Sequence, residues 1–142
     1  MQLKIKLIDG SLPMPSYQTE GSAAFDLYSR IDCQVQSKQV RLIPLNVVMQ
    51  LPKDHWLLMS ARSSLHKQGL MMINGIGVGD YDYRGASDEY HAALYNFTDQ
   101  PAQIKKGQRL VQAIVLPRQK MELLQIDDVE QEQSRGGFGS TG

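Results

Sequence analysis

Short apolar stretches of β-favouring residues, separated by turn signals, run through nearly the whole chain and constrain its fold more than any other feature. Near the start, Leu3, Ile5 and Leu7 alternate with polar residues, a pattern that predicts a half-buried strand. Few stretches have the periodicity of a helix, and the one candidate is a single turn at Ser63–Lys67. Many short strands with regular turn signals predict an all-β barrel, sandwich or jelly roll.

Further apolar runs predict the other strands. Pro44 interrupts one of them, and because proline lacks an N–H group we expect it at a sheet edge or a bulge. Two prolines within Leu12–Tyr17 predict an extended or turning segment there. A turn is expected at Lys106–Gly107. The predicted strand regions are Val40–Leu51, His55–Ala61, His91–Phe97 and Ile104–Leu116.

Length and charge limit the class of protein. With 142 residues the chain is expected to form one domain with a real core. The 15 basic and 15 acidic residues balance, which argues against broad binding of nucleic acid or of a membrane surface. No apolar run approaches the ~20 residues that span a bilayer. The segment Met1–Asp9 is too charged for a signal peptide, so we expect a cytoplasmic protein.

Cysteine and histidine give little sign of redox or metal chemistry. The single cysteine, Cys33, cannot form an internal disulfide, which fits a reducing compartment. We interpret it as a small residue on a strand rather than as a nucleophile. The three histidines, His55, His66 and His91, are scattered, and no metal-binding spacing occurs.

The most unusual stretch is Asn74–Gly85, with the sequence NGIGVGDYDYRG. Alternating glycines in a hairpin suit a flat ligand that lies against bare backbone. The exposed N–H and C=O groups there suit the edge of a nucleobase. Asp80 is a candidate general base that holds a water molecule, and Tyr83 is a candidate wall for a sugar ring.

Three other short segments carry polar side chains, and we expect all three to be short loops between strands. Ala23–Ser29 places Asp26 in an apolar setting, where the alternative is a turn-forming aspartate. Ala61–Leu65 places Arg62 beside two serines, a group suited to phosphate oxygens or, alternatively, a helix N-cap with a surface arginine. Gly107–Gln112 leads into a strand, and its polar side chains are candidates for holding loop backbone.

The chain ends on a glycine-rich segment, Ser134–Gly142, with the sequence SRGGFGSTG. Such a segment is either disordered or a strap that becomes ordered when it closes over a ligand. It offers phosphate-binding groups and one aromatic face for stacking. The polar stretch Asp127–Gln133 precedes it as a tether.

Together these five segments resemble the motifs of the trimeric deoxyuridine triphosphatases (dUTPases), in the family's order and across nearly the whole chain. The resemblance implies a β-clip or jelly-roll fold that assembles as a homotrimer with an exchanged C-terminal arm. It divides the chain into a core, residues 1–126, and a flexible arm, residues 127–142. The motifs are AAFDLYS, ARSSLHKQG, NGIGVGDYDYRG, GQRLVQ and SRGGFGSTG.

The implied reaction is the hydrolysis of dUTP to dUMP and pyrophosphate, which keeps uracil out of DNA and supplies dUMP. By the same resemblance Asp80 is the general base, and Tyr83 packs under deoxyribose. Asp26 contacts water molecules of a triphosphate-bound Mg²⁺ without ligating the metal directly. One subunit supplies the base and sugar pocket, a second supplies phosphate contacts, and a third lends its arm.

The resemblance also implies the substrate-binding residues. The uracil is contacted by Asn74, Gly77 and Val78, and the phosphates by the motif around Arg62 and by the fourth motif. The arm contributes glycine backbone, hydroxyls, a stacking phenylalanine and an arginine. The implied phosphate and arm residues are Arg62, Ser63, Ser64, Gln112, Arg135, Gly137, Phe138, Gly139, Ser140 and Thr141.

Four features depart from the family pattern. Ala61 stands where the family usually has proline, and Gly79 stands where it has a bulky aliphatic residue, which predicts looser packing around Asp80. Arg135 lies two residues closer to Phe138 than is usual. Residues Ser87–Glu89 form an extra piece, interpreted as a surface loop or a contact for another protein.

Two alternatives stay open. A dCTP deaminase shares the fold, but its chemistry needs an acid–base group beside the pyrimidine C4, and the glycine-rich segment offers no obvious glutamate there. The second is a nucleotide-switched binding protein with a regulatory protein partner. The sequence leaves open a cellular or a virus- or phage-encoded origin.

Overall fold

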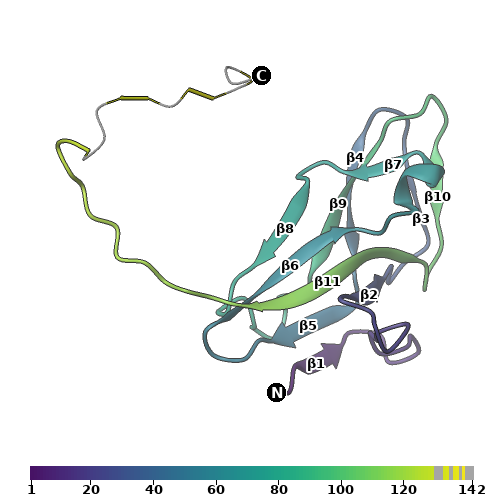
Figure 1. The fold of residues 1–142 in the computed structure, drawn as a ribbon. Coiled ribbons are helices and arrows are strands. Elements are labelled where there is room, and N and C mark those ends of the chain that lie inside the picture. The colour runs from purple at the N-terminus through teal and green to yellow at the C-terminus, as the bar shows by residue number, and fades with distance from the viewer. Residues whose placement is uncertain (130–132, 135, 138, 140–142) are drawn as a thin grey trace.

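The computed structural model describes residues 1–129, 133–134, 136–137 and 139. Within them the chain forms eleven short strands and one 3₁₀ helix, so the all-β prediction is confirmed (Figure 1). In chain order the elements are β1 (Lys4–Leu7), β2 (Phe25–Tyr28), β3 (Cys33–Val35), β4 (Val40–Pro44), β5 (Val47–Gln50), β6 (His55–Ala61), η1 (Leu65–Gln68), β7 (Leu70–Met72), β8 (Ile76–Gly79), β9 (His91–Asn96), β10 (Ala102–Ile104) and β11 (Arg109–Pro117).

The strands form four antiparallel sheets. The largest has the order β2-β11-β6-β8, and a three-stranded sheet has the order β4-β9-β7. Two further pairs, β1 with β5 and β3 with β10, complete the fold. Since most partners are distant in sequence, the fold is held together by long-range pairing, and both β8 and β4 are left as edge strands.

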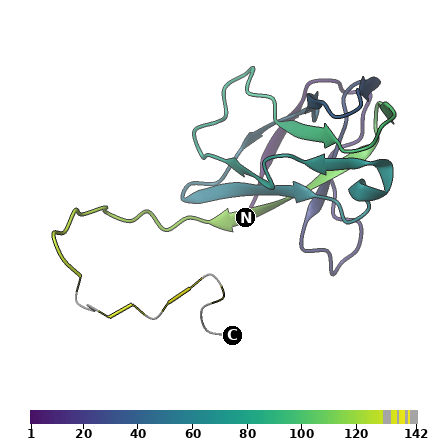
Figure 2. The ribbon, with the colours of Figure 1, turned by 90° about the horizontal axis from the view of Figure 1, so that it is seen from above.

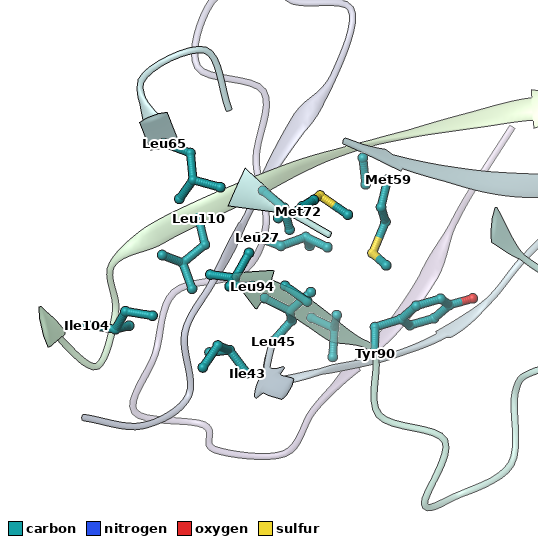
Figure 3. Close-up of a cluster of buried hydrophobic side chains, with 14 of the residues drawn as sticks. Leu27, Ile43, Leu45, Met59, Leu65, Met72, Tyr90, Leu94, Ile104 and Leu110 are labelled. Atoms are coloured by element: carbon teal, nitrogen blue, oxygen red, sulfur yellow. The ribbon is translucent and has the colours of Figure 1, made fainter. Parts of the chain in front are cut away.

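The core lies between the sheets and is built from alternate residues of their strands. Leu27 on β2 and Leu110 on β11 meet Leu94 on β9, and all three side chains are completely buried (Figure 3). Burying a leucine in this way contributes about 1.5–3 kcal/mol. This core fixes the relative positions of the two larger sheets, whose strand ends carry the polar residues described below.

Several predicted elements are confirmed. The alternating segment near the N-terminus forms β1, and its apolar side chains are half-buried. The turn before β11 contains Gly107 with a φ of +79°, a conformation that glycine adopts without strain. Pro44 is the last residue of β4, at the edge of its sheet, as its missing N–H requires.

Two predictions about local structure are wrong. The segment around Asp26 is not a loop, because β2 pairs with β11 and buries Phe25 and Leu27. The glycine-rich segment is not a hairpin either: β7 pairs with β9, whereas β8 pairs with β6. The turn at Asn74–Gly75 therefore carries the chain from one sheet to the other. In both cases the strand partner lies far away in sequence, where local patterns give no signal.

After β11 the described residues contain no further helix or strand. Residues 118–129 run away from the sheets, as both ribbon views show (Figures 1 and 2). This segment leads toward the glycine-rich C-terminal motif. The division into a core of residues 1–126 and an arm of residues 127–142 remains a prediction.

Candidate active site

Two separate hollows collect the polar residues that the sequence singled out. The first, which we call the glycine pocket, has a volume of about 330 Å³. The second, the arginine pocket, has the same volume of about 330 Å³. The glycine pocket is lined by Met59, Asn74, Gly77, Val78, Gly79, Asp80, Tyr83, Tyr90 and His91. The arginine pocket is lined by Gln18, Ser22, Ala23, Ala24, Asp26, Arg62, Ser63, Gln112 and Ile114.

The wall of the glycine pocket is the strand β8. As an edge strand, it has one side whose N–H and C=O groups pair with no other strand. A Cβ atom on Gly77 would lie 2.8 Å from Cε of Met59, so this position tolerates only glycine unless the neighbour shifts. The strand thus presents bare backbone, which suits the hydrogen-bonding edge of a planar ligand.

Gly79 is not the loosely packed position that the sequence suggested. It is buried, and a Cβ atom there would lie 2.7 Å from the Tyr90 hydroxyl and 2.9 Å from Cβ of Leu57. The ring of Tyr90 therefore occupies the space that a larger side chain at this position would need. The backbone that leads into Asp80 is packed by Tyr90 instead.

Asp80 and Tyr83 lie together at the mouth of the glycine pocket. Asp80 follows the end of β8 and is exposed, and its main-chain carbonyl accepts the N–H of Tyr83 at 3.2 Å. The ring of Tyr83 meets Tyr90 edge to face, with 5.2 Å between the ring centroids. A carboxylate and an aromatic face are thus held beside the bare strand.

Asn74 lies at the turn that precedes β8. Its side-chain amide donates to the Ile76 carbonyl at 2.9 Å, and Gly75 has a φ of +69°. These features fix the turn and place the Asn74 side chain at the end of the pocket.

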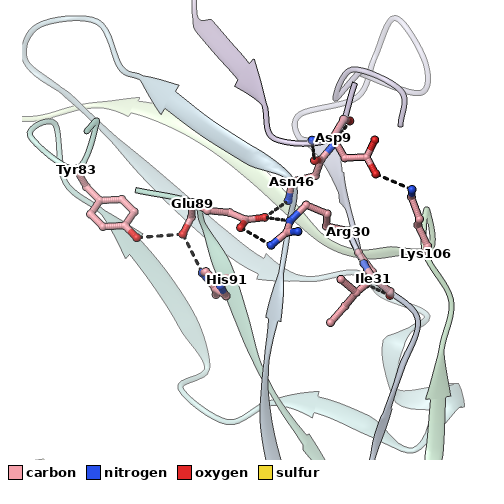
Figure 4. Close-up of polar contacts among 9 residues, drawn as sticks. Asp9, Arg30, Ile31, Asn46, Tyr83, Glu89, His91 and Lys106 are labelled. Carbon is pink, nitrogen blue, oxygen red and sulfur yellow. Dashed lines mark hydrogen bonds and ion pairs between the residues drawn. The ribbon is translucent and has the colours of Figure 1, made fainter. Parts of the chain in front are cut away.

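The extra piece after Gly85 is only partly a surface loop. Ser87 is exposed, but Glu89 is buried, and Arg30 donates two hydrogen bonds to its carboxylate, at 2.8 and 3.0 Å. The main-chain N–H of Asn46 also donates to this carboxylate at 2.9 Å. The carboxylate in turn raises the pKa of Arg30 above its ordinary value. The expectation of a surface loop is therefore wrong for Glu89, whose side chain is buried against Arg30 and Asn46 (Figure 4).

The arginine pocket is organised by one buried carboxylate. Asp26 is 5% exposed, and one of its carboxylate oxygens forms an ion pair with Nε of Arg62 at 2.9 Å. The other oxygen accepts a hydrogen bond from an Nη of Arg109 at 3.1 Å. Arg109 also donates to the side chain of Gln18 at 2.9 Å. Two cationic groups against one anionic group leave an excess of positive charge beside the hydroxyl of Ser63. Such a site suits an anion with several oxygens.

The fourth motif supports this pocket through backbone contacts. The side chain of Gln112 donates to the Ala61 carbonyl at 3.2 Å, and the N–H of Arg62 donates to the Leu110 carbonyl at 3.3 Å. β11 therefore holds the loop that carries Arg62. Ser64 stands at the N-cap position of η1 and its side chain makes no capping bond.

The structure brings together most of the predicted residues, in two groups. Sequence reasoning missed Tyr90 and His91 in the glycine pocket, and it gave Arg109 only a backbone role, because no local pattern links these residues to their partners. Gly137 and Gly139 are exposed and line neither pocket. The predicted residues Arg135, Phe138, Ser140 and Thr141 lie outside the described residues.

Within the described parts of the chain, no group of three or more metal-binding side chains occurs. The same residues include no helix that is long and apolar enough to cross a membrane. Cys33 is half-buried on β3, as expected, and burial raises the pKa of its thiol, which disfavours the reactive thiolate.

Comparisons with known proteins agree on one family. The dUTPase family model matches residues 11–142. The deoxyuridine 5'-triphosphate nucleotidohydrolase of Dictyoglomus turgidum is 36% identical over 148 residues, covering 100% of this chain and 99% of that protein. The enzyme of the same name from Nautilia profundicola is 33% identical over 144 residues, covering 100% of this chain and 99% of that protein.

Solved structures show the same fold. The crystal structure of dUTPase from Streptococcus mutans aligns with a TM-score of 0.77 at 27% identity, covering 83% of this chain and 98% of that one. The dUTPase of Staphylococcus bacteriophage 80alpha with dUPNHPP aligns with a TM-score of 0.86 at 22% identity, covering 99% of this chain and 98% of that one.

Proposed function

The chain belongs to the dUTPase family and hydrolyses dUTP, and we propose that it does so by water attack on the α-phosphorus with Asp80 as the general base. The observation that carries this assignment is the position of Asp80. Its exposed carboxylate lies at the mouth of a pocket walled by bare backbone and an aromatic ring. A positioned carboxylate of this kind contributes about 10²–10⁴-fold to a rate by taking a proton from water.

The glycine pocket is proposed to bind the base and the sugar. The free edge of β8, around Gly77 and Val78, offers N–H and C=O groups to the edge of uracil, and Asn74 closes its end. Tyr83 offers its ring to deoxyribose, where a 2′-hydroxyl would collide. A pocket of fixed shape also excludes the 5-methyl group of thymine, because a clash discriminates more strongly than a missing contact.

The arginine pocket is proposed to bind the triphosphate. Arg62 presents a planar fork of donors, and Ser63 adds a hydroxyl. Asp26 holds the guanidinium groups of Arg62 and Arg109 in place before substrate arrives. This preorganisation reduces the cost of ordering long side chains when substrate binds.

Mg²⁺ fits this arrangement as an ion carried by the triphosphate, since it keeps several water ligands and takes phosphate oxygens readily. When bound, it offsets negative charge that develops on the leaving pyrophosphate. Both carboxylate oxygens of Asp26 are already paired with arginines, and their remaining lone pairs suit contacts with metal-bound water rather than direct ligation.

The active site is proposed to form between copies of the chain, in a homotrimer. The two pockets share no lining residue, so within one chain the proposed base pocket and the proposed phosphate pocket are separate. The sheet β4-β9-β7 also has an apolar face that no described part of the single chain covers. On it, Val40, Leu42 and Met71 are 52%, 63% and 45% exposed. Register places Leu42 opposite Ala93, and both Val40 and Met71 opposite Tyr95, so these side chains share one face.

The C-terminal motif is proposed to close over the nucleotide. Glycine N–H groups and the hydroxyls of Ser140 and Thr141 suit phosphate oxygens, Phe138 suits stacking on uracil, and Arg135 suits the phosphate chain. The extended run of residues 118–129 gives this segment the reach to serve a neighbouring copy.

The alternatives weighed above are less well supported. No glutamate lines the glycine pocket in the described chain, and the carboxylate of Glu89 is bound by Arg30 and Asn46. It is thus a poor acid–base group for a dCTP deaminase. A regulatory protein partner stays a prediction, and the exposed part of the extra piece, around Ser87, is the place where it would bind.

The direct test is pyrophosphate release from dUTP compared with dTTP, dCTP and UTP, with and without Mg²⁺. Of the four nucleotides, only dUTP should release pyrophosphate rapidly. This release should depend strongly on Mg²⁺. Ammonia released from dCTP would instead support the deaminase. Truncation before Gly136 should leave the oligomer intact and strongly lower turnover, whereas an undiminished rate would show that the C-terminal segment is not part of the site.

A further inference from the structure

Glu89 belongs to a polar network that joins the segment before β9 to Arg30, Asn46 and Asp9. Its side chain points away from Tyr83, and Arg30 donates a hydrogen bond to each of its carboxylate oxygens (Figure 4). The N–H of Asn46 makes a third contact, and Asn46 is tied in turn to Asp9 through bonds of 2.6 and 3.0 Å. Lys106 and Ser11 hold the pKa of the Asp9 carboxyl well below its ordinary value. The Glu89 side chain is therefore held by Arg30 and Asn46, and Asn46 is linked through the main chain of Asp9 to the Asp9–Lys106 ion pair.

The main-chain carbonyl of Glu89 faces the opposite way, toward the pocket. It accepts the hydroxyl of Tyr83 at 3.0 Å and lies 2.8 Å from Nδ1 of His91 (Figure 4). The next residue is fixed too, because the N–H of Tyr90 donates to Val47 at 3.0 Å. The carbonyl that holds Tyr83 is thus fixed by side-chain bonds on one side and by backbone pairing on the other.

Tyr83 needs such support. It lies on the connection between β8 and β9, outside any strand, and it is 40% exposed. Its described restraints are the turn with Asp80, the edge-to-face contact with Tyr90 and the bond from its hydroxyl to Glu89. Only the last of these fixes the far end of the side chain.

We propose that Glu89, clamped by Arg30, is a positioning residue for sugar selection: it holds the carbonyl that fixes the Tyr83 ring against deoxyribose. The extra piece after Gly85 thereby serves the pocket itself. This inference rests on the proposed role of Tyr83. A wall that is held firmly rejects a 2′-hydroxyl, whereas a wall free to move accommodates it.

The test is a double-mutant cycle on sugar discrimination, measured as the ratio of kcat/KM for dUTP to that for UTP in the full-length protein. Tyr83→Phe removes the hydroxyl but keeps the ring. The paired replacement Arg30→Met with Glu89→Met removes the clamp without leaving one buried charge unpaired. Each should lower the discrimination by about threefold to tenfold, the worth of one hydrogen bond. The combined triple variant should lose no more than either alone, because both changes act through one bond.

Losses that simply multiply in the triple variant, or full discrimination in the paired variant, would overturn the proposal. If the paired variant fails to fold, Glu89→Gln replaces it, with a smaller loss expected in the same direction. Asp99→Asn, which breaks the exposed pair with Lys38, is the control and should not change the ratio. Tyr83→Ala distinguishes a failure of the proposed role of Tyr83 from a failure of this inference. Unchanged discrimination between dUTP and UTP in Tyr83→Ala would remove Tyr83 from its proposed role. Lost discrimination in Tyr83→Ala, with full discrimination in the Glu89 variants, would overturn only the inference about Glu89.

Discussion

The glycine pocket and the arginine pocket are built on opposite principles. The first relies on the unpaired edge of β8, where Met59 and Tyr90 pack against Gly77 and Gly79 in the space that larger side chains would need. The second relies on long charged side chains, with Arg62 and Arg109 held by the buried Asp26. In the proposed function, the first pocket selects the base and sugar by shape and backbone polarity, and the second attracts the triphosphate by charge.

The difference indicates how a small β protein can recognise a nucleotide. Bases differ in small details that rigid backbone can discriminate, whereas phosphates present the same oxygens in every nucleotide and need only charge and donors. Neither pocket alone explains both selectivity and turnover. The changes below perturb each in turn, from the largest expected effect to the smallest.

Replacing Asp80, the proposed general base, should have the largest effect. Asp80→Asn keeps the shape of the glycine pocket but removes the proton acceptor, so kcat should fall about 10³-fold while KM for dUTP changes little. Steady-state pyrophosphate release measures both. Asp82→Asn, on the same exposed loop, is the matched control and should stay near wild type. Undiminished turnover in Asp80→Asn would remove this residue from its role.

Removing the organising carboxylate of the arginine pocket should have an intermediate effect. Asp26→Asn frees Arg62 and Arg109, so we expect kcat/KM for dUTP to fall about tenfold as the preorganised donors are lost. The free energy of unfolding should fall by about 1–2 kcal/mol, less than for a completely buried pair, because both arginines are partly exposed. Denaturant titration measures this. Asp54→Asn, in an exposed pair with Arg118, is the control, and equal behaviour of the two variants would contradict the assignment.

Tyr90→Phe should have the smallest effect on activity and a distinctive dependence on pH. The Tyr90 hydroxyl is buried without a partner in the described residues, and burial raises its pKa from 10.0 to about 12. Below pH 10 the hydroxyl is neutral in both the folded and the unfolded chain, so the variant should be as stable as wild type or slightly more so.

Between pH 10 and 12 the tyrosine ionises in the unfolded chain before it does in the folded one, so wild type loses stability relative to the variant. The difference should reach about 2–3 kcal/mol. Thermal unfolding across this pH range measures it, with Tyr95→Phe as the control on β9. If the stability of wild type and of Tyr90→Phe changed equally with pH, the Tyr90 hydroxyl would not have the raised pKa that its burial implies.

Much of the fold could be predicted because strands leave a local signal. The alternation in β1 and the apolar runs of β6, β9 and β11 follow from burial of one or both faces. β2 was missed because Asp26 interrupts a strand of only four residues, and its charge is explained by arginines elsewhere in the chain. Pairing could not be predicted, since β8 finds its partner in β6 and not in the strand just before it.

The site residues also fall into those that the sequence predicts and those that it does not. Asp80, Tyr83, Asn74 and Arg62 belong to short motifs whose residue types indicate their chemistry. The partner of Glu89 is Arg30, 59 residues away, and no pattern links them. Tyr90 fills the space that Gly79 leaves, a compensation that becomes visible only when both lie in one structure.

Mixing two inactive variants tests the central claim most directly, namely that one active site takes its glycine pocket and its arginine pocket from different copies of the chain. Asp80→Asn and Arg62→Ala are each expected to be inactive. Unfolded together and refolded in equal amounts, they should recover about a quarter of wild-type turnover, because every mixed ring of three then contains one site with both residues intact. No recovery in mixed oligomers verified by mass spectrometry would mean that both pockets of a site belong to one chain, and the account would be wrong.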